Sequence, residues 1–240
     1  MATLVFDIES VALPLEQFDE AQLEYLFRET EKITDEAQKE LRRQEITQQL
    51  ALSPFTAQVV CIAMLNADTK RGQVLYLCPD ESEEDEEQAG PVEFVPFPDE
   101  VEMLTAFWDV SKHYEQIVTF NGRSFDIPFI YLRSAILNIP ISRKDWLGYR
   151  FTTEPHCDLA EQLTFYGVSG KEGAARRFNL DFYCKTFHID SPKSHGVTGR
   201  DVNQLFYENR HREIAEYCLR DVQATVELFH IWKERLSGIK

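Results

Sequence analysis

The amino-terminal stretch VFDIES, residues 5–10, alternates apolar and acidic side chains with the period of a β-strand. On a strand, Asp7 and Glu9 lie side by side on one face. Phe6 and Ile8 then lie on the opposite face, where they can pack in a core. Two carboxylates at this separation repel each other unless a positive charge lies between them. The first constraint on the fold is therefore a buried strand that requires a cation beside it.

Composition is that of one globular α/β domain. The chain has 240 residues, of which 43% are hydrophobic, so we expect a single domain over residues 1–240. No run approaches the roughly 18 to 20 apolar residues that span a membrane. The amino terminus also lacks a basic region followed by an apolar one. We therefore expect no membrane association and a cytoplasmic location.

The net charge of −16 at first argues against nucleic acid as a partner, because phosphate binding depends on Lys and Arg. The charge is uneven, however: residues 1–119 have 8 basic and 26 acidic side chains, and residues 120–215 have 13 and 11. Much of the excess lies in DESEEDEE, residues 80–87. Such runs repel themselves and stay solvated, which predicts an acidic loop over about residues 79–91. The alternative is a docking site for a basic protein partner.

Hydrophobic periodicity predicts the order of the elements. A strand over residues 2–8 precedes a helical insert at about residues 15–50, and two further strands at residues 58–65 and 73–79 suggest an antiparallel start to the sheet. A helix capped by Asp99 follows, and QIVTF, residues 116–120, is a short strand that ends at Asn121-Gly122. The last segment, Arg212 to Leu236, is an amphipathic helix.

Two more acids lie where the pattern favours neutral or apolar side chains. Asp126 falls at the start of a helix just after the strand at residues 116–120, and capping of that helix is its alternative role. Asp221 lies in the buried stripe of the last helix, where a half-exposed position is the alternative. Tyr217 precedes it by four residues, so the two side chains are neighbours on one helix face.

Clustered or buried carboxylates are costly unless they are protonated, paired or bound to metal. Four of them suit hard divalent cations such as Mg²⁺ or Mn²⁺. Two such ions can activate a water molecule and stabilise a departing oxygen in phosphodiester hydrolysis. The cations also answer the objection from net charge, since they attract phosphate to the place where chemistry occurs.

Three short motifs in this chain resemble the exonuclease motifs of the DEDD family of 3′-to-5′ exonucleases. They are FDIES at residues 6–10, FNGRSFD at residues 120–126 and YCLRD at residues 217–221. The chain is most similar to the Tyr subgroup, DEDDy, and within it to stand-alone exonucleases related to the proofreading domain of family B DNA polymerases. The His subgroup has a histidine where this chain has Glu216. Further similarity covers most of the chain and includes HCDL with Asp158.

The resemblance implies an RNase H-like α/β fold with a central five-stranded mixed sheet flanked by helices. It implies that two ions, Mg²⁺ or Mn²⁺, are bound by Asp7, Glu9, Asp126 and Asp221. Tyr217 would help to orient the attacking water, because a phenol with an ordinary pKa near 10 is a poor base at neutral pH. The implied reaction releases nucleoside 5′-monophosphates from the 3′ end of a single strand, DNA rather than RNA.

Substrate contacts are also implied by the resemblance. The residues concerned near the catalytic motifs are Ile8, Ser10, Phe120, Asn121 and Phe125. Phe125 has a role in the core as its alternative. Candidates for contacts with backbone phosphates lie in the half of the chain with a positive balance, and their alternative is a solvated surface charge: Lys171, Arg176, Arg177, Lys193 and Arg200.

Three other functions remain open at this stage. Trimming of RNA is the nearest, because no motif shows how a 2′-OH would be met. A non-catalytic nucleic-acid-binding or protein-binding domain on the same fold is the second, and it predicts loss of at least one metal-site acid. An RNase H-type endonuclease is the third, and it gives no reason for the spacing between Tyr217 and Asp221.

Overall fold

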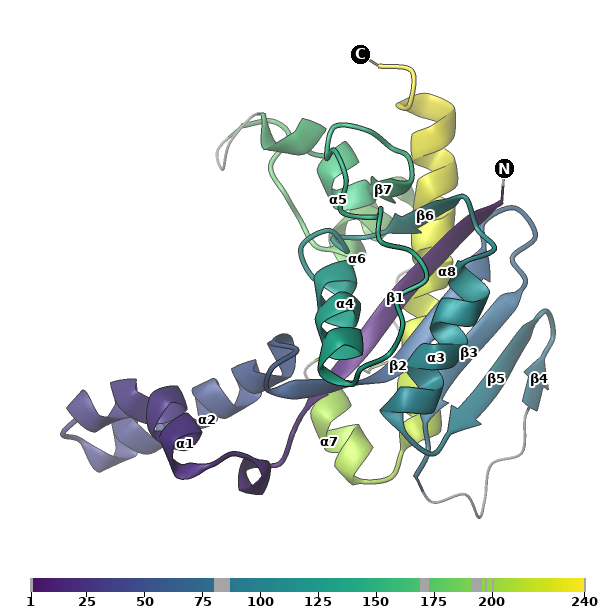
Figure 1. Ribbon diagram of the computed structural model, residues 1–240. Helices are drawn as coiled ribbons and strands as arrows, with labels where there is room; N and C mark the ends of the chain where they lie inside the picture. The colour runs from purple at the N-terminus through teal and green to yellow at the C-terminus, as the bar shows by residue number, and fades with distance from the viewer. Residues whose placement is uncertain are drawn as a thin grey trace.

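A computed structural model describes residues 2–79, 87–168, 173–190, 196, 198–199 and 201–239. These residues form one mixed sheet with helices on both faces (Figure 1). The strands are β1 (Thr3–Ala12), β2 (Ala57–Asn66), β3 (Gly72–Leu77), β4 (Glu87–Ala89), β5 (Val92–Phe97), β6 (Gln116–Thr119) and β7 (His156–Asp158). Their order across the sheet is β4-β5-β3-β2-β1-β6-β7.

The predicted α/β class and the antiparallel start of the sheet are confirmed, since β1 pairs with β2 and β2 with β3 in antiparallel fashion. The predicted count of five strands is wrong, because the described sheet has seven. The two missed strands form a hairpin, β4 and β5, that begins at Glu87 inside the range expected to be the acidic loop. Pro96 argues against a strand at β5, because proline is rare inside sheets. β4 pairs only with residues 92–94, however, so the proline lies beyond the β4–β5 ladder. Residues 80–86 of the acidic run lie outside the described part.

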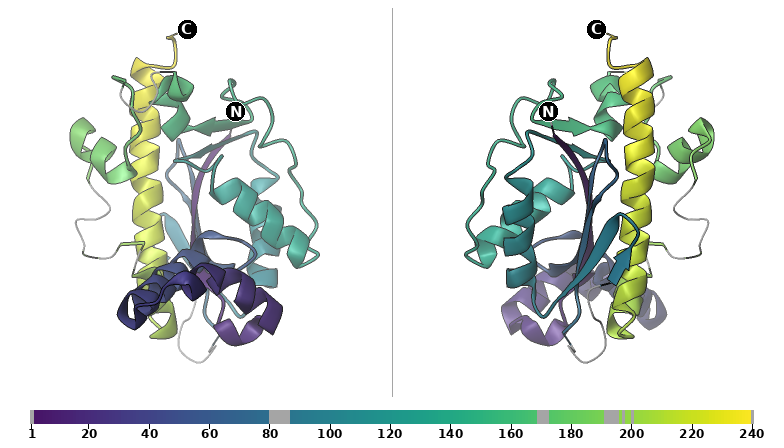
Figure 2. Two further views of the ribbon diagram at one scale, coloured as in Figure 1. Left: turned by 90° about the vertical axis from the view of Figure 1, so that its left-hand side faces the viewer. Right: turned by 90° about the vertical axis from the view of Figure 1, so that its right-hand side faces the viewer.

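Helices cover the two faces of the sheet unequally. The α-helices are α1 (Glu20–Phe27), α2 (Glu36–Gln49), α3 (Glu100–Ser111), α4 (Asp126–Ile136), α5 (Leu159–Gln162), α6 (Leu180–Phe187), α7 (Val202–Tyr207) and α8 (His211–Arg235). Figure 2 shows the sheet nearly edge-on, with the long α8 on one face and α3 and α4 on the other. Within the described residues, no helix has the length and apolar character needed to cross a membrane.

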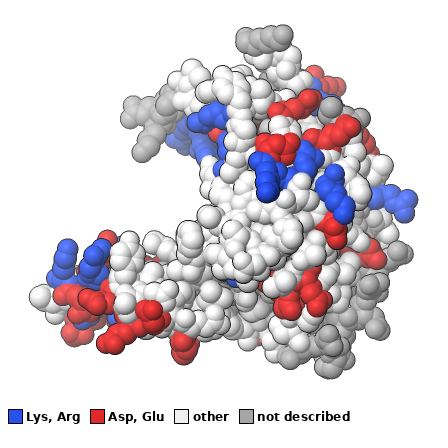
Figure 3. Space-filling model, viewed as in Figure 1, with Lys and Arg blue, Asp and Glu red and all other residues white. Residues whose placement is uncertain are grey.

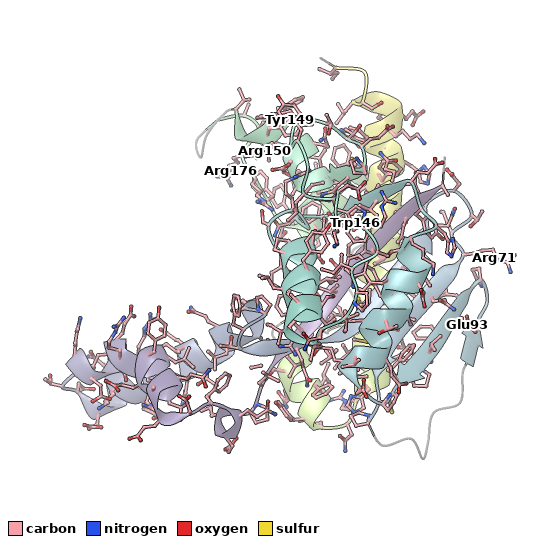
Figure 4. All side chains as sticks on the ribbon, in the orientation of Figure 1. Arg71, Glu93, Trp146, Tyr149, Arg150 and Arg176 are labelled. Atoms are coloured by element: carbon pink, nitrogen blue, oxygen red, sulfur yellow. The ribbon has the colours of Figure 1, made fainter. Side chains whose placement is uncertain are left out.

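The alternation of β1 divides the core as its sequence predicts. Phe6 lies on the α3 face, with its ring 5.4 Å from that of Phe107 and 5.8 Å from that of Trp146. Trp146, which belongs to the loop between α4 and β7 and is labelled in Figure 4, is completely buried. Asp7 and Glu9 therefore face α8, on the other side of the sheet.

Residues 15–52 form an arm that projects from the sheet (Figures 1 and 2). The expected helical insert is present as α1 and α2, whose amino termini are capped by Asp19 and Asp35. The arm has a small core of its own, in which Phe27 and Ile46 are buried. Its many acids and few bases show as mixed colours at its tip in Figure 3.

Three strands at one side of the sheet run parallel, so their carboxyl ends meet at one edge. β6 pairs in parallel with β1 and with β7. Val5 is opposite Val118, so Asp7 stands just beyond the end of the β6 ladder. Ligands of open α/β sheets bind at the carboxyl ends of such strands, which directs attention to Asp7 and the loop after β6.

Candidate active site

The face of β1 that carries Asp7 and Glu9 meets α8 directly. Ligand atoms of Asp7, Glu9 and Cys218 all lie within 4.8 Å of one another. The Cys218 thiol also donates a hydrogen bond to the backbone oxygen of Asp7, at 3.5 Å. Between Glu9 and Ser10 the register with β2 shifts, so the strand is irregular just after the second acid.

Asp126 reaches β1 from the first residue of α4. Its Oδ1 accepts a hydrogen bond from the backbone N–H of Ile8, at 3.2 Å, and its side chain is 2% exposed. Phe125 occupies the N-cap position. The site residue Asp126 is therefore fixed by β1 rather than exposed at a helix end.

The turn between β6 and α4 explains the Asn-Gly pair in the second motif. Asn121 has φ of 73°, a left-handed conformation that asparagine tolerates better than most residues. At Gly122, an added Cβ would lie 2.4 Å from Oγ1 of Thr119, so only glycine fits there. The Thr119 hydroxyl instead accepts a hydrogen bond from the Gly122 N–H at 3.1 Å. This tight turn brings α4 back over the end of β1.

Tyr217 and Asp221 come to the same place from α8. Tyr217 is 5% exposed, and a Cβ added at Gly199 would lie 3.9 Å from the Tyr217 hydroxyl. Asp221 lies one turn beyond Tyr217 on α8, and its carboxylate acts on the Tyr217 phenol by raising its pKa. The structure thus brings together the four acids and the tyrosine that the motifs singled out.

The carboxylates raise one another's pKa values. Burial raises the pKa of Asp7 well above its usual range, and the charges of Asp126, Asp221 and Glu9 raise it further. Burial and the charge of Asp221 do the same for Glu9. Burial raises the pKa of Asp126 to about 7, against backbone hydrogen bonds that lower it. Without a cation, the cluster resists full ionisation at neutral pH.

The phenol of Tyr217 is even less acidic than usual. Burial raises its pKa above the ordinary value of 10.0, and the charges of Glu9 and Asp221 raise it further. The hydroxyl therefore keeps its proton at any working pH. It can orient a neighbouring oxygen but cannot act as a base.

Asp158 supports the site from β7, a role that the sequence motifs did not assign to it. Its carboxylate accepts hydrogen bonds from the backbone N–H groups of Asn121, at 3.0 Å, and Arg123, at 2.9 Å. It also caps α5 by accepting from the N–H of Ala160 at 2.9 Å. Its charge contributes to the raised pKa of Asp126. The signal in the sequence was HCDL, an acid directly after a buried strand.

The predicted substrate-contact residues lie around these acids with their side chains differently engaged. Ile8 is buried, at 4% exposed, and the Ser10 hydroxyl donates to the backbone oxygen of Ala51 at 2.7 Å. The half-buried rings of Phe120 and Phe125 pack on those of Tyr183 and Phe129. The Asn121 side-chain oxygen accepts a hydrogen bond from Arg177.

Among the basic candidates for phosphate contacts, Arg176 and Arg177 are exposed. Lys171, Lys193 and Arg200 lie outside the described residues. The contact of Arg177 with Asn121 places one basic side chain beside the second motif.

The acids of this cluster have the chemistry of a metal centre. In the described part of the chain, no Lys or Arg forms an ion pair with Asp7, Glu9 or Asp126. Carboxylate oxygens are the ligands that Mg²⁺ and Mn²⁺ prefer. Cys218 adds a soft atom, but burial raises the pKa of its thiol well above the usual range, so it stays protonated and is a poor ligand. The four carboxylates fit the predicted pair of divalent ions.

This combination of sheet, parallel strand ends and clustered acids defines a protein of the RNase H-like α/β class. A family described as "Predicted 3′-5′ exonuclease related to the exonuclease domain of PolB" matches residues 52–236. The chain belongs to this family. Asp126, Tyr217 and Asp221 lie within the matched range, whereas Asp7 and Glu9 precede it.

Relatives of known name are archaeal enzymes called DNA polymerase 1. That of Saccharolobus solfataricus is 27% identical over 177 residues, which cover 71% of this chain and 19% of the polymerase. That of Sulfolobus acidocaldarius is 30% identical over 182 residues, with the same coverage of 71% and 19%. That of Sulfurisphaera ohwakuensis is 32% identical over 139 residues, covering 55% and 15%. The chain thus spans less than a fifth of the length of the curated relatives it matches.

Proposed function

We propose that this protein is a 3′-to-5′ exonuclease that uses two divalent ions, Mg²⁺ or Mn²⁺. Its substrate is the 3′ end of single-stranded DNA, from which it releases nucleoside 5′-monophosphates. The observation that carries the proposal is the meeting of Asp7, Glu9 and Asp126 on one strand face with no Lys or Arg paired to them among the described residues. Membership of the exonuclease family supports the direction of attack, and relatives named as DNA polymerases support DNA.

The four acids would hold the ions, and they come from three elements of the fold. Asp7 and Glu9 belong to β1, Asp126 begins α4, and Asp221 lies on α8. When bound, the ions supply an activated water molecule and stabilise the departing oxygen. The four carboxylates lose their mutual repulsion in the ion-bound state, so ion binding is accompanied by release of protons at neutral pH.

Tyr217 is a hydrogen-bonding residue in this proposal. Its hydroxyl keeps its proton because burial and the neighbouring carboxylates raise its pKa. Glu9 and Asp221 are both close enough to raise the pKa of this phenol, so the hydroxyl lies beside the cluster. From there it orients the attacking water toward the phosphate without removing a proton.

Residues after β6 provide the contacts for the terminal nucleotide. The turn at Asn121 is held by a hydrogen bond from its N–H to Asp158, and the proposed contacts here are Phe120, Asn121 and Phe125. Ile8 and Ser10 complete the proposed contacts from β1, Ile8 through packing beneath the site. Rigid placement of such groups is what makes a reacting geometry reproducible.

The test follows single strands of DNA and RNA of the same sequence, labelled at the 5′ end, with Mg²⁺, Mn²⁺ or EDTA. We expect a ladder of DNA shortened stepwise from the 3′ end, free nucleoside 5′-monophosphate, and no reaction in EDTA. Asp7→Ala should slow hydrolysis more than about a thousandfold, since ion binding lowers the pKa of water from about 16 to about 7. Asp109→Ala, an exposed acid on α3 paired with Lys112, is the matched control and should keep full activity.

Each alternative gives a different result in this assay. Internal cuts at early times indicate an endonuclease. Digestion of RNA with DNA left intact replaces the proposed substrate with RNA. Unchanged hydrolysis by Asp7→Ala contradicts the proposed site.

A further inference from the structure

A second surface lies outside the acid cluster and combines exposed aromatic rings with arginines. We call it the aromatic–arginine surface, and it is formed by Tyr149, Arg150, Phe151, Tyr166, Arg176 and Arg177. Figure 4 shows Tyr149, Arg150 and Arg176 near one another, above the arm and on the side of the molecule to which the arm projects. Tyr149 is 71% exposed and Phe151 is 53% exposed, which is unusual for large rings without a bound ligand.

The rings form a continuous series. The Tyr149 ring lies 5.5 Å from that of Phe151, and the Phe151 ring lies 5.0 Å from that of Tyr166. Interplanar angles of 64° and 66° show that neighbouring rings meet edge to face, so they do not cover one another's faces by stacking. Bases of a single strand stack on faces of this kind with little regard to sequence.

Positive charge accompanies the rings. A cavity of about 530 Å³ is lined by Arg150, Arg176 and Arg177, and Glu161 is the one acid among its described lining residues. Glu161 pairs with Arg150 and also with Arg123, so a single carboxylate is shared by two guanidinium groups. Figure 3 shows Lys and Arg side chains gathered above the hollow between this region and the arm. The surface is therefore suited to phosphate.

The surface is held in place by contacts within the chain. The Tyr166 hydroxyl accepts a hydrogen bond from Gln162 at 2.8 Å. Phe165 and Tyr166 both have left-handed backbones, with φ of 47° and 57°, which side-chain-bearing residues seldom adopt. Such outliers cluster at ligand-binding positions. The Arg150 guanidinium lies 5.5 Å from the centre of the Phe151 ring.

The surface is continuous with the proposed active site. Ser124 lines its cavity and stands two residues before Asp126. Arg177 lines the same cavity and donates a hydrogen bond to the side chain of Asn121. A strand whose terminal nucleotide occupies the site can therefore continue over Asn121 onto the arginines and rings.

We propose that the aromatic–arginine surface binds the single-stranded substrate upstream of its terminal nucleotide, with phosphates on the arginines and unpaired bases on the rings. The inference rests on the proposed function, because the surface would bind the part of the substrate strand that lies outside the active site. Arginine alone would also suit an acidic peptide. Exposed rings in series with the arginines favour a nucleic acid, because each nucleotide offers one phosphate and one π-face.

The test measures binding of fluorescent oligothymidylates to the Asp7→Ala protein, in which hydrolysis is blocked. We compare a long oligomer of about sixteen nucleotides with a short one of about four. Tyr149→Ala combined with Phe151→Ala should weaken binding of the long oligomer at least about fivefold, the effect of losing roughly one stacked base. Binding of the short oligomer should not change. Tyr25→Ala removes a ring that is 70% exposed on the arm, and as the matched control it should leave both affinities unchanged.

The arginines are tested by salt dependence. Arg176→Gln should reduce the slope of log affinity against log salt for the long oligomer by about 0.7, the value for one phosphate contact on a single strand. Arg42→Gln, which lies on the arm, is the control and should leave the slope unchanged. Circular dichroism and thermal unfolding of each variant establish that it is folded, and Tyr149→Ala alone serves if the double variant is not.

Four results would overturn the inference. One is a long oligomer bound equally by the ring variants and their parent. Another is equal affinity of the parent protein for the ordinary long oligomer and for a long oligomer without bases at its upstream positions. Equal affinity would mean that stacking of bases on the rings contributes nothing to binding. A salt slope unchanged by Arg176→Gln is the third. Polyglutamate that displaces the oligomer at equal charge concentration would assign the surface to acidic peptides.

Failure of this inference can be told apart from failure of the proposed function. The wild-type protein with Mn²⁺ is given the p-nitrophenyl ester of thymidine 5′-monophosphate, which holds one nucleotide and cannot reach the rings. If this ester is hydrolysed but the ring variants bind the long oligomer as well as their parent, the inference about the surface is wrong and the proposed function stands. If neither the ester nor the labelled strands are hydrolysed, the proposed function is wrong, whatever the binding assay shows.

Discussion

Buried acids at two places in this molecule have opposite surroundings. Glu100, the first residue of α3, is 6% exposed and receives two hydrogen bonds from Arg133 of α4, one of them at 3.0 Å. Its Oε1 also accepts from the N–H of Val59 at 2.8 Å. Asp126 is 2% exposed, yet its neighbours Asp7 and Asp158 are acids.

The difference shows where each group obtains its positive charge. At Glu100 the chain supplies it, through an arginine that also donates to the backbone oxygen of Pro54 and so ties α4 to the start of β2. At the acid cluster the chain supplies backbone N–H groups but no paired Lys or Arg among the described residues for Asp7, Glu9 or Asp126. A closed pair of this kind serves the fold, whereas under the proposed function the cluster takes its cations from solution.

Arg133→Met leaves Glu100 without a paired base, which is the condition of the cluster acids. The free energy of unfolding should fall by about 3–5 kcal/mol, since a buried charge is left without its partner. Urea denaturation measures this loss. The double variant with Glu100→Gln should recover much of it, and a double variant no more stable than the single one would show that the arginine acts through packing alone.

Tyr217→Phe tests the role of the hydroxyl beside the cluster without altering the charge of the cluster. The ring stays in the core while the hydroxyl beside Asp221 is lost. We expect the rate of hydrolysis to fall about tenfold to a hundredfold, as for other residues that orient groups around a metal. Single-turnover rates and Mn²⁺ affinity are measured on the same preparation. A parallel loss of Mn²⁺ affinity would contradict a role limited to hydrogen bonding.

Asp126→Asn relieves the repulsion while keeping an oxygen that can accept from the Ile8 N–H. The pKa of Asp126 is raised to about 7, so the native state holds a proton that the unfolded state loses near pH 4. This group therefore stabilises the ion-free protein at low pH, and the contribution is lost as pH rises from about 4 to about 7.

In EDTA at pH 7.5, Asp126→Asn should therefore raise Tm by at least about 2 °C, the shift of roughly 1 kcal/mol in a domain of this size. The gain should shrink as the pH is lowered toward 4. Mg²⁺ should raise the Tm of the wild type more than that of the variant, because the ion binds the native carboxylates. A gain that is independent of pH would mean that the aspartate is not repelled in the native state.

Much of the fold could be predicted because its signals are local. The alternation in β1 and the apolar stripe of α8 depend on periods of two and 3.6 residues, and both elements form where these periods place them. The convergence of Asp7, Asp126 and Asp221 followed from the motifs together, since each motif alone is short and common. The structure brings them together, while their catalytic roles stay predictions.

Other features depended on contacts between distant residues and left little trace in the sequence. The hairpin of β4 and β5 follows an acidic run and contains Pro96, so its local pattern argues against a strand. The bond between Arg177 and Asn121 joins residues that are far apart in the chain. Asp158 acts on backbone N–H groups of a neighbouring loop, which no side-chain pattern reveals.

The most direct test of the central claim counts the Mn²⁺ ions that bind to each chain. Electron paramagnetic resonance measures free Mn²⁺ during a titration, and subtraction of the same titration with Asp7→Ala removes ions held by surface acids. We expect the wild type to bind two more Mn²⁺ ions per chain than Asp7→Ala, with protons released as they bind at neutral pH. Identical titration curves for the two proteins would contradict the proposed metal site, because the cluster that contains Asp7 would then bind no Mn²⁺.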